Sequence, residues 1–414
     1  MRGHAVWASL AALTCRTFAH GTLLRSAATG GAIGEEKAWV QQLRDARAAA
    51  SCRPATANGK IVFVTGTGGF VGYHVALALR ARGDGVLGLD NFNGHYPSGL
   101  KRTRAGTLEQ AGVITLEADL NDADALKAAT ELCNFTHVLH LAAQPGVRYA
   151  LKDPDAYVKS NVGGFVSVLE RVRKLDPMPS VVYASSSSVY GTNTKMPFSE
   201  EDAVDSPASL YAATKREDEL LAHTYNHLFH IPLTGLRFFT VYGPYGRPDM
   251  ALFGFANRIL KGEPVTVYTG PDGREMERDF TYIDDIVRGC LGALDNVRLS
   301  RSALKARNMT VSAADDSPPK LYNLGNEHPA TVSKLLDLLE EFMGKRAVRE
   351  YVPASNTGDV FRTFANVSLA RAELGYQPQI PLREGVRRFV GWYQEFYKDG
   401  LDAAMLRYSA DGAV

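Results

Sequence analysis

Residues 60–83 read KIVFVTGTGGFVGYHVALALRARG, and this stretch decides the fold. The apolar run KIVFVT predicts a buried strand, and GFVGYHVALALRARG predicts an amphipathic helix that ends at Gly83. Between them, Gly66, Gly69 and Gly72 have the spacing of a turn whose backbone N–H groups can approach a phosphate closely. A strand, a glycine-rich turn and a helix in this order predict the first unit of a doubly wound α/β fold.

Strand-like and helix-like segments continue to alternate after this unit. GVLGLD, VITLEA, HVLHLAA, SVVYASS and LTGLRFF predict further buried strands. We therefore expect a Rossmann-type, mostly parallel sheet with helices on both faces and ligands at the carboxyl ends of its strands. The turn-rich segments and helical patterns that follow predict a smaller C-terminal lobe. The expected parts are an N-terminal targeting or anchor segment with a linker (1–59), the Rossmann domain (60–240), a substrate-binding lobe (241–400) with a mobile, low-complexity insertion (298–320), and a tail (401–414).

The composition is that of an ordinary globular protein, with 45% hydrophobic residues among 414 and a formal net charge of +1. This near-neutral balance gives no indication of nucleic-acid binding. The four cysteines (Cys15, Cys52, Cys133 and Cys290) form no CxxC pair and no metal-type spacing with histidine. We therefore expect unpaired thiols and no metal site.

The N-terminal segment leaves its destination open. The first 34 residues contain no Asp or Glu, and their apolar stretch AVWASLAALTC is shorter than the ~20 residues that span a bilayer. A signal peptide, an organelle transit peptide and a short anchor all fit this pattern. EEKAWVQQLRDARAAA predicts a short polar helix and SCRPATANGK a linker, so we expect the folded body to start near Lys60. NMT at Asn308 and NVS at Asn366 would be glycosylation acceptors only in a secretory compartment.

Asp90 closes the second predicted strand, downstream of the glycine turn. Its carboxylate can accept hydrogen bonds from an adenosine ribose and would repel a 2′-phosphate. With the glycine turn, this predicts NAD as the cofactor rather than NADP. The alternative interpretation is that Asp90 is an exposed turn residue.

Two further patterns supply hydroxyl groups. YASSSSVYG (183–191) carries four consecutive serines after a predicted strand, and LYAATKRE places Tyr211 and Lys215 one helical turn apart. Taken in order with TGTGGFVG, HLAA and RDFTYIDD, these motifs resemble the extended short-chain dehydrogenase/reductase superfamily, roughly over residues 60–397.

The resemblance implies roles for three of these side chains. A phenol with a pKa near 10 is a poor base at neutral pH, but a neighbouring ammonium and a cationic nicotinamide ring both favour the phenolate. Tyr211 would take a proton from a sugar hydroxyl while hydride passes to NAD. Lys215 would also bond the nicotinamide ribose, and Ser186 would orient the sugar, with Ser185 and Ser187 as neighbouring candidates. The implied contacts to tightly bound NAD are Gly66, Gly69, Phe70, Val71, Gly72, Asp90, Asn91, Asp119, Leu120, Leu141, Ala142, Ala143, Asn161, Tyr211 and Lys215.

The serine run lacks a carboxylate. Relatives that eliminate water carry Asp-Glu in this loop, and nucleotide-sugar decarboxylases tend to carry Glu, whereas the four positions after Ala184 are all serine. Elimination needs both an acid and a base, but oxidation, rotation of the keto sugar and reduction need only the one tyrosine. The loop therefore favours a 4-epimerase. LDNFNGHYPSGLKR, AAQPGVRYAL and LTGLRFFTVYGPYGRPDMA resemble the UDP-glucuronate 4-epimerases.

A uronate substrate agrees with the side chains expected around the sugar. Hydroxyl groups and an arginine can hold a C6 carboxylate, and this would protect the 4-keto sugar, a β-keto acid, from losing CO2. The diphosphate would be held by an arginine and the uridine by a tyrosine and an aspartate, although each of these could instead be an ordinary surface residue. The expected substrate contacts are Arg148, Ser186, Ser187, Ser188, Thr240, Arg247, Tyr268, Arg278 and Asp359.

Three alternatives remain open: a UDP-glucose/galactose 4-epimerase, a UDP-glucuronate decarboxylase, and a non-catalytic Rossmann scaffold that binds NAD or RNA. The resemblance implies a homodimer formed through the helices after DPDAYVKS and around SLYAATKREDEL. It also implies a Golgi or other secretory location, with membrane contact only through the N-terminal segment, while organelle-targeted and cytoplasmic locations stay open.

Overall fold

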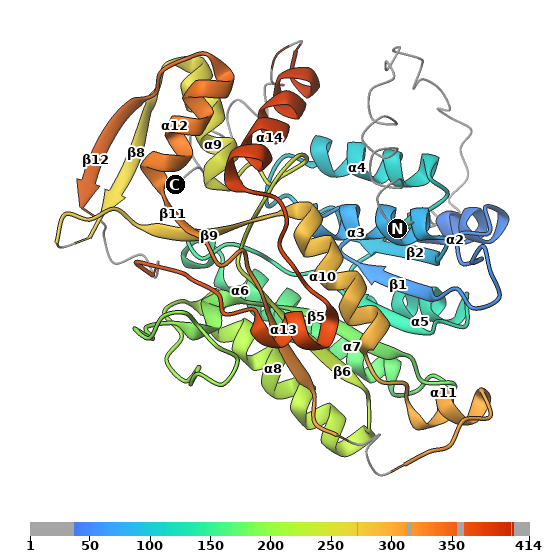
Figure 1. The fold of residues 1–414 in the computed structure, drawn as a ribbon. Helices are drawn as coiled ribbons and strands as arrows, with labels where there is room; N and C mark the ends of the chain where they lie inside the picture. The colour runs from blue at the N-terminus through green and yellow to red at the C-terminus, as the bar shows by residue number, and fades with distance from the viewer. Residues whose placement is uncertain (1–36, 271, 313–316, 354–359, 399, 401–414) are drawn as a thin grey trace, which may run out of the picture. The chain divides into compact units, whose positions relative to one another are not determined.

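The computed structural model describes residues 37–398 and 400, except 271, 313–316 and 354–359. Within these residues the main sheet has seven strands in the order β10-β6-β5-β4-β1-β2-β3, and every neighbouring pair is parallel (Figure 1). The strand order reverses between β1 and β4, and this confirms the predicted Rossmann-type doubly wound fold. The strands are β1 Ile61–Thr65, β2 Gly85–Asp90, β3 Ile114–Glu117, β4 His137–His140, β5 Ser180–Ser186, β6 Leu233–Phe238 and β10 Lys320–Leu324.

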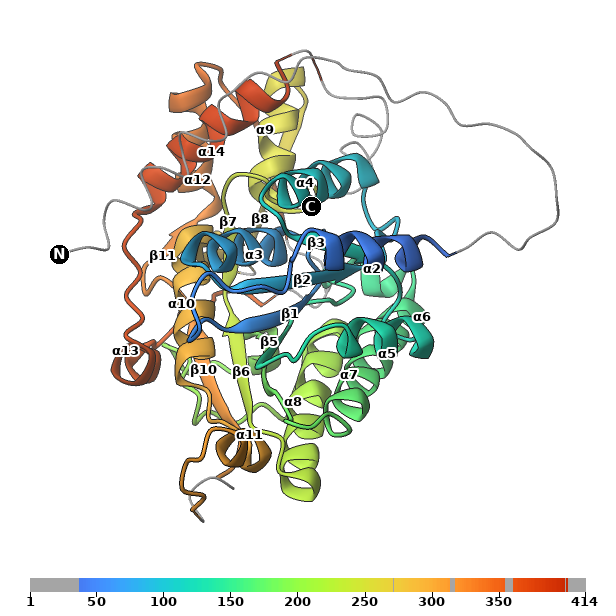
Figure 2. The ribbon, with the colours of Figure 1, turned by 90° about the vertical axis from the view of Figure 1, so that its right-hand side faces the viewer.

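Helices cover both faces of this sheet (Figure 2). Successive residues of β1 supply both cores: Val62 and Val64 pack into the core on the side of α3 and α10, and Phe63 packs into the core under α5, α7 and α8. This two-sided burial explains why the strands read as continuous apolar runs. The helices are α3 Phe70–Arg82, α4 Ser98–Gln110, α5 Ala123–Glu131, α7 Gly164–Val172, α8 Leu210–Phe229 and α10 Ile283–Asn296.

A smaller lobe lies at the carboxyl ends of the strands. It contains a three-stranded sheet in the order β11-β9-β7 and a parallel pair of β8 with β12. The predicted boundary at residue 240 is not a complete break, because α10 packs against α3 and β10 pairs with β6 at the edge of the main sheet. The elements of this lobe are β7 Thr240–Tyr242, α9 Ala251–Lys261, β8 Pro264–Thr269, β9 Glu277–Tyr282, β11 Pro329–Thr331, α12 Val332–Met343, β12 Val348–Pro353 and α14 Leu382–Phe396. Helix α13 (Ser368–Leu374) packs instead on α10 and β10.

The folded body starts earlier than the predicted Lys60. Helix α2 (Ala38–Ala48) packs against β3 and α5, and its Ala46 is fully buried. Ser51 accepts a hydrogen bond from the Val86 N–H (2.8 Å) through its carbonyl, so the expected linker lies against the sheet. The predicted polar helix is confirmed, but its few apolar residues are enough to anchor it.

The prediction of unpaired thiols is wrong for Cys52 and Cys133, which form a disulfide with 6.2 Å between their Cα atoms. The pair is separated by 81 residues and comes together only because the segment after α2 folds back beside α5. Cys290 is a free, buried thiol, as predicted, and Cys15 lies outside the described residues.

The insertion at 298–320 begins with ordered structure rather than a mobile segment. Residues Arg301–Ala306 form helix α11, whose N-terminus is capped by the Ser300 hydroxyl. Ser300 donates to the Met178 carbonyl at 2.5 Å, and Met178 N–H donates to the Ser302 hydroxyl at 2.8 Å. These contacts hold the start of the insertion against the turn before β5. In the part of the chain that the structure describes, no helix is both long and apolar enough to cross a membrane.

Candidate functional site

A cavity of about 1280 Å³ lies at the carboxyl ends of the main-sheet strands and extends under the smaller lobe. This is the position that the doubly wound topology predicts for a ligand. Two of the predicted site residues are not among its lining: Asn161, and Asp359, which lies outside the described residues. The predicted residues that do line it are Gly66, Gly69, Phe70, Val71, Gly72, Asp90, Asn91, Asp119, Leu120, Leu141, Ala142, Ala143, Arg148, Ser186, Ser187, Ser188, Tyr211, Lys215, Thr240, Arg247, Tyr268 and Arg278.

The glycine turn forms one end of the cavity. Gly66 has a φ of +81°, and a Cβ atom there would lie 2.7 Å from the backbone nitrogen of Ala142. A Cβ atom on Gly72 would lie 2.1 Å from the Gly66 carbonyl oxygen. The turn therefore packs backbone against backbone and leaves its outer side open. Helix α3 starts here without a side-chain cap, so its N-terminus can receive a pyrophosphate.

Asp90 is buried beside this turn and is not the exposed residue of the alternative interpretation. Its carboxylate accepts hydrogen bonds from the N–H groups of Gly68 (3.0 Å) and Phe92 (2.8 Å), which fix it against the cavity wall. Asp119 lies next along the wall and accepts from the Asn91 amide (3.0 Å). Partial burial opposes ionisation of Asp119, but hydrogen bonds from Asn121 and Asn91 outweigh it and lower the pKa of this carboxyl. These two acids fit the adenosine end of a dinucleotide.

Asn161 supports the site instead of lining it. It lies in a π-helical segment (Val158–Gly163) between α6 (Pro154–Tyr157) and α7. Its amide accepts from the Gln144 N–H (2.7 Å) and donates to the Thr214 hydroxyl (3.0 Å), so it ties the loop after β4 to helix α8. The resemblance also implied that Asn161 buttresses the site, and these contacts agree with that role, whereas Asn161 does not line the cavity as a cofactor contact would.

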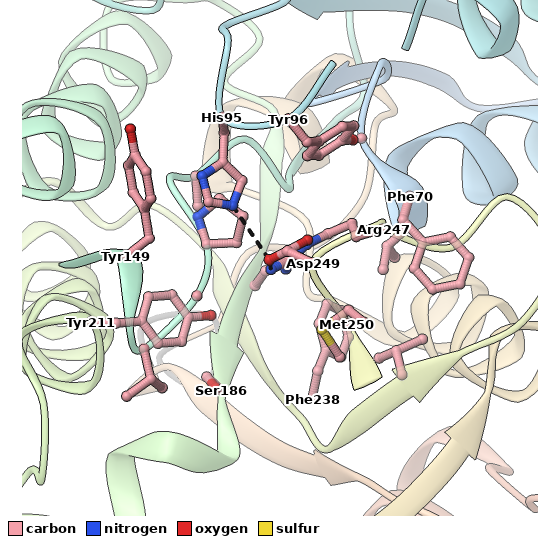
Figure 3. Close-up of a pocket in the computed structure, with 18 of the residues that line it drawn as sticks. Phe70, His95, Tyr96, Tyr149, Ser186, Tyr211, Phe238, Arg247, Asp249 and Met250 are labelled. Carbon is pink, nitrogen blue, oxygen red and sulfur yellow. Dashed lines mark hydrogen bonds and ion pairs between the residues drawn. The ribbon is translucent and has the colours of Figure 1, made fainter. Parts of the chain in front are cut away.

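Tyr211 and Lys215 are placed by the start of helix α8, which the Ser209 hydroxyl caps by accepting from the Ala212 N–H. Figure 3 shows the Tyr211 hydroxyl pointing into the pocket near Ser186. Lys215 is almost completely buried, and its ammonium donates to the Ala184 carbonyl (3.0 Å) and to the Asp218 carboxylate (2.9 Å). The one-turn spacing thus brings a phenol and an ammonium to the same wall as the end of β5.

The four serines are not equivalent. Ser185 donates to the buried Glu219 carboxylate at 2.7 Å, so its hydroxyl is committed to the core. Ser186 ends β5 and accepts from the Ser188 N–H (3.2 Å) while donating to the Ser188 hydroxyl (3.1 Å). Ser187 and Ser188 are half-buried at the cavity. Of the three candidates for the catalytic hydroxyl, the geometry favours Ser186 over Ser185.

A charged cluster lies across the pocket from Tyr211 (Figure 3); sequence reasoning predicted its Arg247 but missed Asp249 and His95. Arg247 pairs with Asp249, with 2.9 Å between its Nε and a carboxylate oxygen, and His95 Nε2 lies 3.4 Å from the same carboxylate. Burial opposes ionisation of Asp249, but Arg247 and His95 hold the pKa of this carboxyl well below its usual range. The Gln144 amide nitrogen lies 2.8 Å from His95 Nδ1, on the other side of the ring from Asp249. Only the Arg-Pro-Asp spacing hinted at Asp249, and no local pattern indicated His95.

The remaining predicted substrate residues lie toward the smaller lobe. The Arg148 guanidinium stacks over the Tyr268 ring at 5.0 Å from its centroid. Arg278 donates to the carbonyls of Glu277 (3.0 Å) and Phe361 (3.2 Å), which hold it at the start of β9. A cationic group and an aromatic face on this side fit a nucleotide diphosphate, and their roles stay predictions.

Residues 62–306 of this chain match the protein-family model described as "NAD dependent epimerase/dehydratase family". The chain belongs to this family. It is 53% identical to UDP-glucuronate 4-epimerase 5 of Arabidopsis thaliana over 362 residues, which cover 87% of this chain and 80% of that protein.

Solved structures of two similar proteins agree with this assignment. The UDP-glucuronic acid 4-epimerase from Bacillus cereus, in complex with UDP-glucuronic acid and NAD, has a TM-score of 0.71 and 32% identity, covering 81% of this chain and 99% of that one. A tyrosine-to-phenylalanine variant of that enzyme, in complex with UDP-4-deoxy-4-fluoro-glucuronic acid and NAD, gives the same values. NAD is thus the cofactor of this family, and the glycine turn with Asp90 provides a matching cradle in this chain.

Proposed function

We propose that this chain interconverts UDP-glucuronate and UDP-galacturonate by oxidation and re-reduction at C4 of the sugar. The observation that carries the proposal is the serine loop without a carboxylate, which shares one cavity with Tyr211, Lys215 and Arg247. The similarity to UDP-glucuronate 4-epimerases supports the choice of substrate.

The proposed chemistry needs one proton carrier from the protein. When bound, NAD supplies a reversible hydride acceptor at the sugar. Tyr211 removes the proton from the C4 hydroxyl and returns it after the sugar has turned over. The Lys215 ammonium stabilises the phenolate, and Ser186 orients the sugar hydroxyl. The glycine turn and Asp90 retain the cofactor through both half-reactions, so that no external cofactor is consumed.

The uronate carboxylate would lie between the serine loop and Arg247. Ser187, Ser188 and Thr240 offer neutral donors, and Arg247 offers a charge that Asp249 already orients. A firmly held carboxylate keeps the C–C bond to C6 from aligning with the π system of the C4 carbonyl, so that CO2 is retained while the sugar is a β-keto acid. This separates epimerisation from decarboxylation in the proposed site.

The test is NMR of the purified full-length protein incubated with UDP-glucuronate and no added cofactor. Formation of UDP-galacturonate is the expected result. A UDP-pentose product would show decarboxylation, and turnover of UDP-galactose alone would show a neutral-sugar epimerase. If none of these three reactions is detected, a non-catalytic scaffold would be favoured.

Two variants test the role of the tyrosine in the same assay. Tyr211→Phe is expected to lower kcat by roughly a hundredfold to ten-thousandfold, because it removes the proton carrier. Tyr225→Phe is the matched control, because Tyr225 lies on the same helix and its hydroxyl donates to Glu170 (3.0 Å), outside the cavity lining. Wild-type turnover by Tyr211→Phe would remove Tyr211 from the mechanism.

The proposal includes a homodimer that pairs α7 and α8 of two subunits. Leu220 and Leu228 on α8 are 53% and 58% exposed, and these apolar side chains support that surface. Light scattering after gel filtration should give twice the mass of one chain for the wild-type protein. A Leu220→Glu, Leu228→Glu double variant should give the mass of a single chain.

The proposal places the folded body in the lumen of the secretory pathway. The Cys52–Cys133 disulfide suits an oxidising compartment, and Asn308 is exposed at the end of α11, as a glycosylation acceptor must be. Asn366 is a poorer acceptor because its side chain accepts from the Ser368 N–H (3.0 Å). A glycan at Asn308, removed by an endoglycosidase, is expected in protein from the native cell; free Cys52 and Cys133 thiols there would contradict this location.

A further inference from the structure

The ammonium group of Lys215 is held by two partners before any ligand is considered. It donates to the Ala184 carbonyl at 3.0 Å and to the Asp218 carboxylate at 2.9 Å. The Lys215 and Asp218 side chains are only 2% and 1% exposed. An ammonium has three N–H donors. One donor therefore remains for the cavity, and the direction of this donor is set by the other two.

The Asp218 carboxylate has fewer hydrogen-bond partners than a buried carboxylate with a purely structural role normally has. Its second oxygen, Oδ1, is buried and has no hydrogen-bond partner among the described residues. The neighbouring Glu219 is different, because its two oxygens accept from Ser185 (2.7 Å), Arg237 (2.8 and 2.9 Å) and Arg216 (3.1 Å). Leaving a buried carboxylate oxygen unpaired is costly. Asp218 therefore contributes little to the stability of the fold, but its other oxygen accepts a hydrogen bond from Lys215 of the proposed site.

The charges around the pair leave Asp218 as the main counter-charge of Lys215. Burial acts to lower the pKa of the Lys215 ammonium, but Asp218, Tyr211 and Glu219 together raise it. Glu219 is already matched by Arg237 and Arg216. On the β4 side, burial and Lys215 lower the pKa of His140 to about 3, so His140 is neutral at working pH.

Asp218 itself is ionised at neutral pH. Burial raises the pKa of its carboxyl to about 6, against the opposing effect of Lys215. The other groups that act on it are Glu219 on α8, the exposed Glu217 on α8 and the Tyr183 hydroxyl on β5, whose pKa burial, Glu219 and Asp218 raise, so that it stays protonated.

We propose that Asp218 is a positioning residue that fixes the direction of Lys215 and offsets part of its positive charge. The fixed direction presents the one remaining N–H to the cofactor ribose. The offset charge weakens the electrostatic effect of Lys215 on Tyr211, and so changes the pH dependence of the proposed reaction. This inference rests on the proposed function for its second half, whereas the first half concerns cofactor retention alone.

Two variants separate position from charge. Asp218→Asn keeps an acceptor for Lys215 and removes the negative charge, and Asp218→Ala removes both. With Asp218→Asn, the acidic limb of the kcat/KM profile for UDP-glucuronate should move to lower pH by about one unit, because a negative charge near the tyrosine has been lost. With Asp218→Ala, the NAD retained through gel filtration should fall at least threefold. Glu217→Gln, an exposed neighbour with the same charge change as Asp218→Asn, should alter neither quantity.

The outcomes distinguish this inference from the proposed function. If Asp218→Asn changes the melting temperature but leaves the acidic limb of the kcat/KM profile at the wild-type pH, Asp218 has only a structural role. This result would overturn the charge role. Full NAD retention by folded Asp218→Ala would overturn the positioning role. If the wild-type protein turns over no UDP-sugar, the proposed function fails, and the NAD-retention comparison still decides whether Asp218 positions Lys215.

Discussion

The Glu219→Gln substitution should destabilise the fold strongly, although it changes few atoms. Glu219 and Arg237 are buried to 1% and 2% exposure and share two hydrogen bonds of 2.8 and 2.9 Å. Glutamine would keep one acceptor oxygen but point an NH2 group at donors of Arg237 or Arg216. Arg237 would then keep its buried charge without a counter-charge.

Removing one partner from a buried ion pair costs about 3–5 kcal/mol. A folded body of this size has an unfolding entropy of roughly 0.8 kcal/mol/K, so the apparent Tm should fall by about 4–6 °C. Circular dichroism during thermal unfolding at pH 7.5 measures this fall. The assay needs no substrate, so it tests the packing argument independently of the proposed function.

Glu217→Gln is the matched control, since Glu217 is exposed on the same helix and makes the same change of charge. Its Tm should stay within about 1 °C of the wild type, because exposed charges contribute little. A Glu219→Gln protein that melts within 1 °C of this control would refute the reasoning. It would mean that Arg237 finds another partner or that water reaches the pair.

Three further predictions follow from the site and the core. Gly72→Ala should abolish NAD retention, measured after denaturation, because its Cβ would lie 2.1 Å from the Gly66 carbonyl oxygen; NAD at the wild-type level would contradict this. Arg247→Lys should raise KM for UDP-glucuronate about tenfold in initial-rate assays, because the planar fork paired with Asp249 is lost while the charge stays; an unchanged KM would place the carboxylate elsewhere. Burial keeps His74, His137 and His140 neutral in the folded protein. Below about pH 6.5 these side chains therefore bind protons in the unfolded chain but not in the folded one. The histidine contribution to stability should therefore be full above that pH and fall by about 1.4 kcal/mol per group and pH unit toward pH 5. Asp218 and Asp279, whose pKa burial raises to about 6, offset part of this fall because the folded state binds their protons first. Urea unfolding at pH 7.5 and 5 should still show the lower midpoint at pH 5, and equal midpoints would contradict the prediction. The pKa is lowered to about 4 for His74 and to about 3 for His137 and His140.

The sequence by itself was sufficient for the fold class, the glycine turn and the placement of Tyr211 and Lys215 at one cavity. These features depend on short-range patterns: a strand, a turn and a helix in register, and a tyrosine and lysine one helical turn apart. Asp90 was predictable for the same reason, because it ends a strand that must lie beside the first. A local pattern is enough whenever the chemistry requires a fixed spacing along one element.

Only the tertiary structure decided the features that join distant segments. The Cys52–Cys133 disulfide spans 81 residues and needs the segment after α2 to fold back onto the sheet edge. His95 reaches Asp249 across 154 residues, and no local pattern indicates His95 or its pairing with Asp249. The separate roles of Ser185 and Ser186 follow from which side of β5 each side chain takes, one toward Glu219 and one toward the cavity. Burial, pairing and charge compensation are properties of packed neighbours, and a linear pattern does not specify those neighbours.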